Sequence, residues 1–308
     1  MAEPEAILDE LVTIRDWLRY AVSRFNAAGL VYGHGTATAL DEAAFLILHT
    51  LHLPIDQLDP WFDARLLASE RDAVSKIIEM RIETRKPSPY LTQEAWIGGY
   101  SFYVDERVIV PRSYIGELLC RQIEATAGEW HLGFDPGPVG AVLDLCTGSG
   151  CLAILAALAF PEAEVDASDV SADSLAVAER NISDYGLAKR LLLVQSDLFS
   201  AHRGKVYDLI LANPPYVDAE ALADFPPEYT AEPAVAHAGG ADGLDLVRRI
   251  LAEAGDHLSP TGTLVVEIGR GRQLLEEQFP DLPFAWLDTA DSKGEVFALA
   301  ASGLQRQT

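Results

Sequence analysis

Short apolar runs alternate with helical segments through the second half of this chain, and no other feature constrains the fold as strongly. Such alternation is typical of βαβ units, in which helices cover both faces of a parallel sheet. The expected strands are AVLDLC, EVDASDV, LLLVQSD, YDLILA, TLVVEIG, FAWLD and EVFALA, with helices at 151–159, 174–185, about 243–257 and from Gly271. We therefore predict an α/β fold with a Rossmann-like sheet of seven strands, the last of them antiparallel.

The first ninety residues follow a helical pattern instead. Apolar residues recur at steps of three and four from Ile7 to Phe25, and a second helix is expected from about Asp41. A third is expected from Ser69, whose Ser-x-x-Asp pattern resembles a capping box, up to Pro87. These elements predict a small helical domain at residues 1–90.

A β-hairpin is expected to link this domain to the sheet, at residues 91–111. Aromatic and β-branched residues such as Phe102 and Val110 lie there among glycines and an Asp-Glu turn. After Pro111 a helix leads into the loop GFDPGPVG, where Pro and Gly prevent regular structure. Residues 112–308 are therefore assigned to the α/β domain.

The chain of 308 residues has 47 acidic and 23 basic side chains, which give a formal charge of −24. This acidity opposes binding to free nucleic acid, because phosphate contacts require clustered Lys and Arg. A basic partner would be attracted. A large net charge also serves solubility alone, and the sequence does not separate these two explanations.

The cysteines at 120, 146 and 151 lack the spacing of a disulfide framework or a zinc site, so we expect reduced thiols and no bound metal. The first residues lack the pattern of a signal peptide. No run approaches the 18 apolar residues of a membrane span. We expect a soluble, cytoplasmic protein without membrane contact.

The run VLDLCTGSGCLA indicates a cofactor-binding turn between a strand and a helix. Gly148 and Gly150 permit backbone angles and a close ligand approach that a Cβ would obstruct, and Ala153 lets the helix pack tightly on the strand. The whole turn is Cys146, Thr147, Gly148, Ser149 and Gly150. By itself this glycine pattern also fits a dinucleotide.

Asp144 distinguishes between the two cofactor classes. It lies inside the strand, four positions before Gly148, where an unpaired charge is costly. The ammonium group of a methionine-type cofactor would neutralise it, directly or through water, whereas a pyrophosphate would be repelled. The pattern therefore favours S-adenosylmethionine over a nicotinamide dinucleotide.

Two more acids follow strands at the same edge of the predicted sheet. Asp169, beside Val170, is placed to accept hydrogen bonds from ribose hydroxyls. Asp197, beside Leu198, is placed to accept from an adenine amine, and capping of a turn is an equally good interpretation. These four residues complete the expected cofactor site.

The most informative motif is the tetrapeptide Asn213-Pro214-Pro215-Tyr216, directly after the strand YDLILA. It therefore lies at the edge of the sheet that carries the cofactor turn. Two consecutive prolines make the backbone stiff and have no N–H, so the carbonyls are free to accept from a ligand. A planar NH₂ group matches these acceptors, and the alternative is a rigid loop without a catalytic role.

We hypothesise that the Asn213 side-chain oxygen and the Pro214 carbonyl each accept one hydrogen of a substrate NH₂, while Tyr216 stacks on the flat group. Asn213 would border the cofactor as well. An amide nitrogen is a poor nucleophile, so alignment and pyramidalisation would supply most of the catalysis. No strong base is required, since the nitrogen becomes acidic after methylation. The tetrapeptide thus indicates methyl transfer to a planar amide or amine nitrogen.

Three other features carry less information. The segment GGADGL at 239–244 either closes over the site or is an ordinary loop before a helix. Glu267 ends the strand TLVVEIG, and a solvated position near the site is expected. For His34 and His237 we expect structural or solvated roles.

At these motifs the chain resembles the family of protein glutamine side-chain methyltransferases related to HemK. The resemblance covers nearly the whole chain, including VIVPR, DLCTGSG, SDLF, NPPY and GGADGL. It implies a class I S-adenosylmethionine-dependent methyltransferase fold. It also implies that Asn213 contacts the target glutamine. Separately, we hypothesise that the N-terminal helical domain recognises the protein substrate.

Within that family the chain is similar to the PrmB-type branch, which modifies ribosomal protein L-three of the large subunit. The segments carrying this similarity are RDWLRYAVSRFNAAGLVYGHGT, PSPYLTQEAW and FYVDERVIVPRSYIGELL. The other branch modifies the Gly-Gly-Gln loop of peptide release factors and usually has IPRPDTE, where this chain has VPRSY at 110–114. The resemblance therefore implies a basic large-subunit protein as partner, before or during ribosome assembly.

Three rival interpretations remain open at the sequence level. An adenine methyltransferase uses the same Asn-Pro-Pro-aromatic turn, yet it needs a basic surface and a recognition module that this sequence lacks. A nicotinamide oxidoreductase is disfavoured by Asp144 and does not explain the tetrapeptide. A binding protein without activity would not need both motifs intact.

Overall fold

The computed structural model describes residues 10–125, 131–289 and 292–304. The chain divides into two compact units. One comprises the residues up to Glu94 together with Phe225–Ala231, and the other comprises Ala95–Asp224 and the chain from Glu232 onward. The main chain therefore passes from one unit to the other three times.

The first unit is a helical bundle. Its helices are α2 (Ile14–Ala27), α3 (Ala39–Thr50), α4 (Ala68–Thr84) and the short α5 (Ser88–Thr92), with the 3-10 turns η1 (Asp59–Trp61) and η2 (Pro227–Ala231). Apolar faces of α2, α3 and α4 form its core, in which Trp17, Phe25, Leu46 and Ile78 are fully buried. The predicted helical character of this region is confirmed.

The expected helix starts need correction. The first described helix begins at Ile14, because Thr13 and Asp16 form a reciprocal capping box there. Ile7 lies outside the described residues. The third helix begins at Ala68, one residue before Ser69, and the Glu70 carboxylate accepts from the Leu67 N–H at 2.7 Å. The Ser-x-x-Asp pattern was therefore misleading, since the real cap lies two residues upstream.

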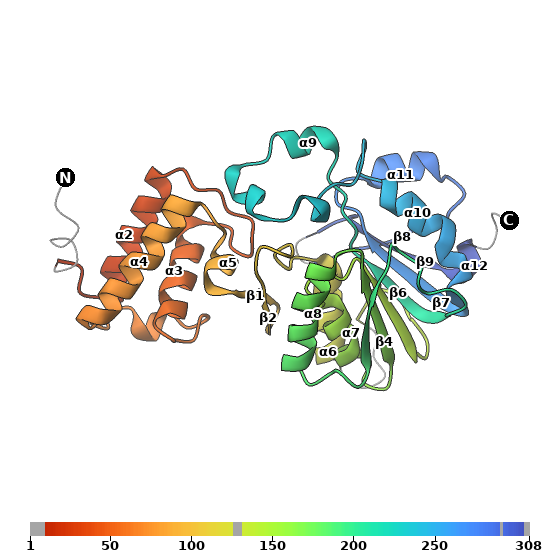
Figure 1. Ribbon diagram of the computed structural model, residues 1–308, viewed down its shortest axis with the longest axis horizontal. Coiled ribbons are helices and arrows are strands. Elements are labelled where there is room, and N and C mark those ends of the chain that lie inside the picture. The colour runs from red at the N-terminus through yellow and green to blue at the C-terminus, as the bar shows by residue number, and fades with distance from the viewer. Residues whose placement is uncertain (1–9, 126–130, 290–291, 305–308) are drawn as a thin grey trace. The chain divides into compact units, whose positions relative to one another are not determined.

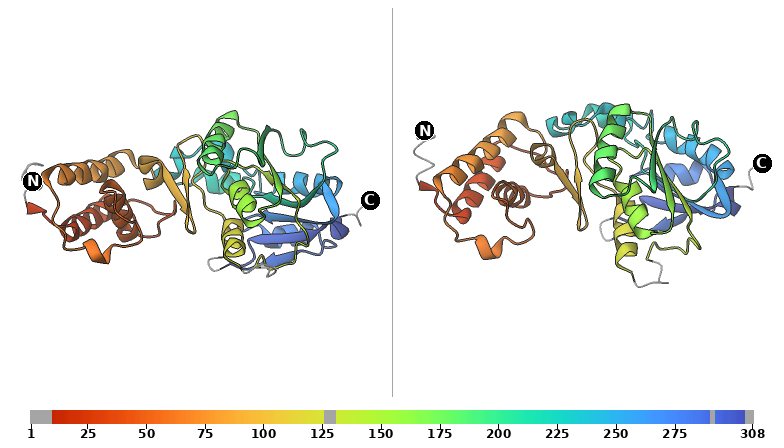
Figure 2. Two further views of the ribbon diagram at one scale, coloured as in Figure 1. Left: turned by 90° about the horizontal axis from the view of Figure 1, so that it is seen from below. Right: turned by 60° about the horizontal axis from the view of Figure 1, so that its bottom comes forward.

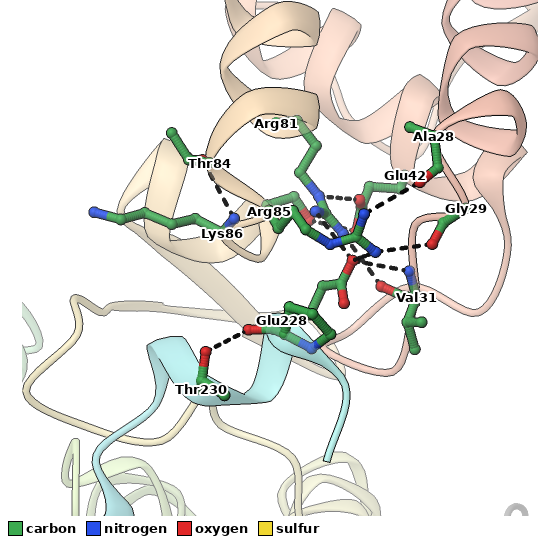
Figure 3. A network of polar contacts seen from close by, with 12 residues as sticks. Ala28, Gly29, Val31, Glu42, Arg81, Thr84, Arg85, Lys86, Glu228 and Thr230 are labelled. Carbon is green, nitrogen blue, oxygen red and sulfur yellow. Dashed lines mark hydrogen bonds and ion pairs between the residues drawn. The ribbon is translucent and has the colours of Figure 1, made fainter. Parts of the chain in front are cut away.

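A buried group of charges lies inside this helical unit (Figure 3). Arg81 donates to Glu42 at 2.6 Å, and both side chains are buried. The Glu228 carboxylate accepts from the Val31 N–H at 3.1 Å and pairs with Arg85 at 2.7 Å. Glu228 belongs to η2, almost two hundred residues from Val31 in the sequence, so this charge group joins Phe225–Ala231 to the bundle.

The second unit begins with a two-stranded hairpin, β1 (Glu94–Ile97) and β2 (Tyr100–Tyr103). A hairpin thus lies within 91–111, with its turn at Gly98-Gly99, and the Asp-Glu pair lies after β2. Residues 104–110 form no strand. The helix α6 (Tyr114–Glu124) then follows as predicted.

The main sheet has seven strands in the order β5-β4-β3-β6-β7-β9-β8. Only β9 is antiparallel to its neighbours, which confirms the predicted sheet and its last strand. The strands are β3 (Ala141–Leu145), β4 (Glu164–Asp169), β5 (Leu191–Gln195), β6 (Tyr207–Ala212), β7 (Leu258–Glu267), β8 (Ala285–Leu287) and β9 (Val296–Ala300).

Helices cover both faces of this sheet (Figure 1). One face is packed by α6, α7 (Cys151–Ala159) and α8 (Ala172–Asp184), and the other by α10 (Asp245–Glu253), α11 (Arg272–Gln278) and α12 (Ala301–Leu304). Figure 2 shows the strands and these helices from two further sides. Because both faces are covered, strand residues such as Val142 and Leu143 are buried on opposite sides.

The strand register brings four loops to one edge of the sheet. Leu145 pairs with Ser168 on one side and with Ala212 on the other, and Ala212 pairs with Val266. The segments that follow β3, β4, β6 and β7 therefore leave the sheet side by side. Such a carboxyl edge is where open parallel sheets bind their ligands.

Candidate active site

The glycine-rich turn after β3 has the backbone conformation that its sequence predicts. Gly148 has φ +55° and Gly150 has φ +81°, both in the left-handed region that favours glycine. A Cβ at Gly150 would lie 3.1 Å from the Ala178 Cβ, so this glycine lets the turn approach α8. Gly148 has open space around its Cα, which leaves room for a ligand against the backbone. Thr147 and Ser149 are buried beneath the turn, and Cys146 is half-buried.

Asp144 is a buried carboxylate at the base of this turn. Its Oδ2 accepts from the Thr147 hydroxyl and from the Ala153 N–H at 3.1 Å. Its Oδ1 has no hydrogen-bond partner among the described residues. Burial raises the pKa of Asp144 to about 7. An orphaned acidic oxygen of this kind fits a cationic group such as the ammonium of S-adenosylmethionine.

Asp169 connects the second strand to the turn. Its Oδ2 accepts from the Gly148 N–H at 3.0 Å and its Oδ1 from the Ser171 N–H at 2.9 Å. A carboxylate has about four lone-pair sites, so two remain for ribose hydroxyls. The neighbouring Val170 is exposed, with room for a flat apolar ligand group beside it.

Asp197 follows β5, and its side chain is 58% exposed. Its carboxylate pairs with Arg249 of α10 at 3.0 Å, and its carbonyl accepts from the Ser200 N–H in a tight turn. Leu198 is buried, with φ +47°. Asp197 therefore serves the turn through its backbone, while its partly exposed carboxylate still has acceptor sites free for a ligand.

The tetrapeptide leaves β6 at the same edge. Asn213 is half-buried, and its side chain forms no hydrogen bond with any residue in 10–125, 131–289 or 292–304. Pro214 is buried and Pro215 half-buried. The Asn213 amide is therefore available to a ligand, beside the turn that follows β3.

Tyr216 is held in place by its surroundings. Its hydroxyl donates to the Glu267 carboxylate at 3.2 Å. Burial raises its pKa above the usual range. A Cβ at Gly269 would lie 2.8 Å from two atoms of the tyrosine ring, so the ring packs directly on the glycine backbone.

The GGADGL segment packs backbone against backbone on the tetrapeptide. A Cβ at Gly239 would lie 2.7 Å from the Tyr216 Cα, and a Cβ at Gly243 would overlap the Tyr216 carbonyl oxygen. The Val217 carbonyl also accepts from the Gly239 N–H at 2.9 Å. The described contacts thus make this segment a support for Tyr216.

Two buried carboxylates near the site have partners that the sequence did not predict. Glu267 was expected to be solvated, but it is 1% exposed and accepts from the Ser113 hydroxyl. Glu232 is buried and binds Arg112 through both oxygens at 2.6 and 2.7 Å, while His237 lies 3.0 Å away. Ser113 and Arg112 lie 154 and 120 residues from their carboxylate partners, and no local pattern signals such pairs.

Among the described residues, no group of three or more His, Cys, Asp or Glu side chains could hold a metal ion. No helix in the described part of the chain is long and apolar enough to cross a membrane. The three cysteines are free thiols, and burial raises the pKa of Cys120 to about 11. The site is therefore built from carboxylates, amides and backbone groups.

Comparisons with known proteins find relatives that match almost the whole chain. "Ribosomal protein uL3 glutamine methyltransferase" of Bradyrhizobium diazoefficiens is 54% identical over 295 residues, which cover 96% of this chain and 92% of the relative. The relative of the same name from Bordetella pertussis is 55% identical over 295 residues, covering 96% and 97%. The family model "Methyltransferase small domain" matches residues 132–225. The structure of the hMettl16 catalytic domain in complex with MAT2A 3'UTR hairpin 1 is 16% identical, with TM-score 0.50, covering 92% of this chain and 90% of that one.

Proposed function

This chain belongs to the family of ribosomal protein uL3 glutamine methyltransferases, and we propose that Asn213 and the Pro214 carbonyl present a glutamine side chain of uL3 for methylation. Its α/β unit has the class I S-adenosylmethionine-dependent methyltransferase fold, and the cofactor is S-adenosylmethionine. The observation that carries the proposal is the unpartnered Asn213 amide at the carboxyl edge of β6, beside the turn that follows β3.

The reaction forms a bond between the glutamine nitrogen and the methyl carbon while the bond from sulfur to that carbon breaks. The cofactor supplies an electrophilic methyl group on a sulfonium. Asn213 and Pro214 would accept the two amide hydrogens, which orients the nitrogen and favours its pyramidal form. The proton leaves after the transfer, when the nitrogen has become acidic, so no strong base is needed at the site.

The remaining residues of the proposed site hold the cofactor. The orphaned Oδ1 of Asp144 would face the methionine ammonium. Asp169 would accept from the ribose, with Val170 beside it, and Asp197 with Leu198 would border the adenine. The turn Cys146–Gly150 would supply close backbone contact at Gly148.

We also propose that the helical unit recognises the protein substrate, and that methylation precedes or accompanies ribosome assembly in the cytoplasm. A formal charge of −24 supports a basic partner, because long-range attraction raises the rate of encounter. Attraction of this kind falls as the salt concentration rises.

Replacement of Asn213 by Ala tests the proposed function. Incubated with labelled S-adenosylmethionine, the wild-type enzyme should label uL3, while release factors and duplex DNA stay unlabelled. Asn213→Ala should lower turnover on the order of 100-fold or more, because the nitrogen is no longer aligned. Calorimetry should show cofactor binding within about twofold of wild type, since the Asp144 and Gly148 contacts are untouched.

Three outcomes would contradict this scheme. Label in release factors with none in uL3 would reassign the substrate, and label in DNA would favour the adenine methyltransferases. Full turnover by the Asn213→Ala enzyme would remove Asn213 from the mechanism.

A further inference from the structure

Glu267 is a buried carboxylate at the end of β7 that the methyl-transfer scheme above does not use. Its Oε2 accepts from the Ser113 hydroxyl at 2.7 Å and from the Tyr114 N–H at 2.9 Å. Its Oε1 accepts from the Tyr216 hydroxyl at 3.2 Å. Both oxygens are therefore engaged by neutral donors, which come from two distant parts of the chain.

The strand register places Glu267 beside the tetrapeptide. Ala212 of β6 pairs with Val266 of β7, so Asn213 and Glu267 each follow a paired residue on adjacent strands. The tyrosine ring of the tetrapeptide is held by the Gly269 backbone along its edge and by Glu267 at its hydroxyl. The main chain of Tyr216 is in close contact with Gly239 and Gly243. These contacts give the ring one position.

Maintaining the fold alone does not account for a carboxylate at this position. A buried ionised group costs several kcal/mol unless it is well paired, and an apolar side chain of similar size is often as stable or more so. No Lys or Arg among the described residues forms an ion pair with Glu267. Burial raises the pKa of Glu267 to about 7, which reflects this cost.

We propose that Glu267 is a positioning residue for methyl transfer that acts through Tyr216. By holding the tyrosine hydroxyl, it sets the plane of the ring against which the substrate amide lies. This inference rests on the proposed function and on the hypothesis, made from the sequence, that Tyr216 stacks on the substrate amide. It adds a residue that touches neither substrate nor cofactor and still controls the geometry of the reacting nitrogen.

A double-mutant cycle in the full-length enzyme tests this positioning role. In Glu267→Gln the amide oxygen can still accept from Ser113 and Tyr114, but the NH₂ group that faces Tyr216 cannot accept the hydrogen bond that the tyrosine hydroxyl donates to the carboxylate. In Tyr216→Phe the hydroxyl is absent. Each variant should lower kcat for uL3 methylation on the order of tenfold, because misplacement of reacting groups by a fraction of an ångström slows transfer. The cofactor Kd should stay within about twofold of wild type.

Coupling between the two residues is the decisive readout. The double variant should be no slower than the slower single variant, since both changes break the same contact. The inference would be overturned if the two decreases in kcat multiplied in the double variant. It would also be overturned if Glu267→Gln kept the wild-type kcat. A merely structural carboxylate would lower the melting temperature without this coupling in kcat.

Tyr207→Phe is the matched control. Tyr207 is a buried tyrosine at the opposite end of β6, and its hydroxyl donates to the Asp166 carboxylate at 2.6 Å. This variant should lose stability and keep its kcat. Absence of label in uL3 with the wild-type enzyme would overturn the proposed function and this inference together. If uL3 is labelled but the two decreases in kcat multiply in the double variant, the positioning role alone is overturned.

Discussion

At the residue scale, the site is characterised by carboxylates that are buried without a nearby cation. Burial raises the pKa of both Asp144 and Glu267 to about 7, well above the values near 4 of unfolded chains. Between about pH 4 and pH 7 the folded protein therefore binds more protons than the unfolded chain does. Their contribution to stability is complete below pH 4 and is lost as the pH rises through 7.

Asp144 allows a prediction about pH and cofactor affinity. The ionised carboxylate attracts an ammonium group, so the Kd for S-adenosylmethionine should decrease as the pH rises from 6 to 8. Below pH 7 the Kd should rise by up to about tenfold for each pH unit, because the protonated carboxyl binds the ammonium group more weakly. Asp144→Asn should bind more weakly at pH 8 and lose most of this dependence, as measured by calorimetry across the range.

The asparagine variant is close to isosteric, and its amide oxygen can still accept from Thr147 and Ala153. An unchanged pH dependence in Asp144→Asn would assign the titration to another group. Asp169 is the natural candidate, because burial raises its pKa as well.

At the element scale, the position of the tetrapeptide depends on the loop between η3 (Ala234–Ala236) and α10. Gly239 and Gly243 approach Tyr216 more closely than any residue with a side chain could. Arg112 and Glu232 form a bidentate buried pair just before η3, which anchors this loop to the chain that precedes α6. Local rigidity at Asn213 is thus produced by elements far along the sequence.

Gly243→Ala should abolish most of the activity. Gly243 has φ +81°, and a Cβ there would overlap the Tyr216 carbonyl, so the tetrapeptide must shift. Gly186→Ala is the matched control, because Gly186 has φ +69° with open space around it. Both variants should lose about 1 kcal/mol from the strained backbone. Gly243→Ala alone should lose more than about tenfold in kcat, and equal kcat values would refute the support role.

At the scale of the whole molecule, the chain enters the helical unit a second time at Phe225–Ala231. Glu228 holds this segment through Val31 and Arg85, inside the same buried group of charges as Arg81 (Figure 3). The helical unit therefore includes a segment that lies only nine residues after Tyr216. A short stretch of chain thus connects the tetrapeptide to a segment of the helical unit.

Glu228→Ala should destabilise the helical unit. Removing one partner of a buried charge group typically costs about 3 kcal/mol or more, because the remaining charges stay uncompensated. Amide protons of α2 to α4 should then exchange about 100-fold faster in native-state hydrogen exchange. Asp63→Ala, which removes the exposed partner of Arg15, should leave exchange unchanged. Equal protection in both variants would show that the segment is not part of the unit's stability.

Periodicity and turn chemistry predicted the seven-stranded sheet, the helical N-terminal part and the positions of Asp144, Asp169 and Asn213 at strand ends. Those features are local, because a strand or a turn is specified by neighbouring residues. The same local reasoning failed at Ser69, since several short polar residues near a helix start compete to cap it.

The sequence by itself thus determined the fold class and the position of the tetrapeptide directly after β6. Tertiary structure alone decided that Glu267 is buried against Tyr216 and that Glu228 belongs to the helical unit. The physical reason is the same for both. A contact between residues 51 or 197 positions apart depends on how complete elements pack, and side chains that meet in this way have no periodic pattern in the chain.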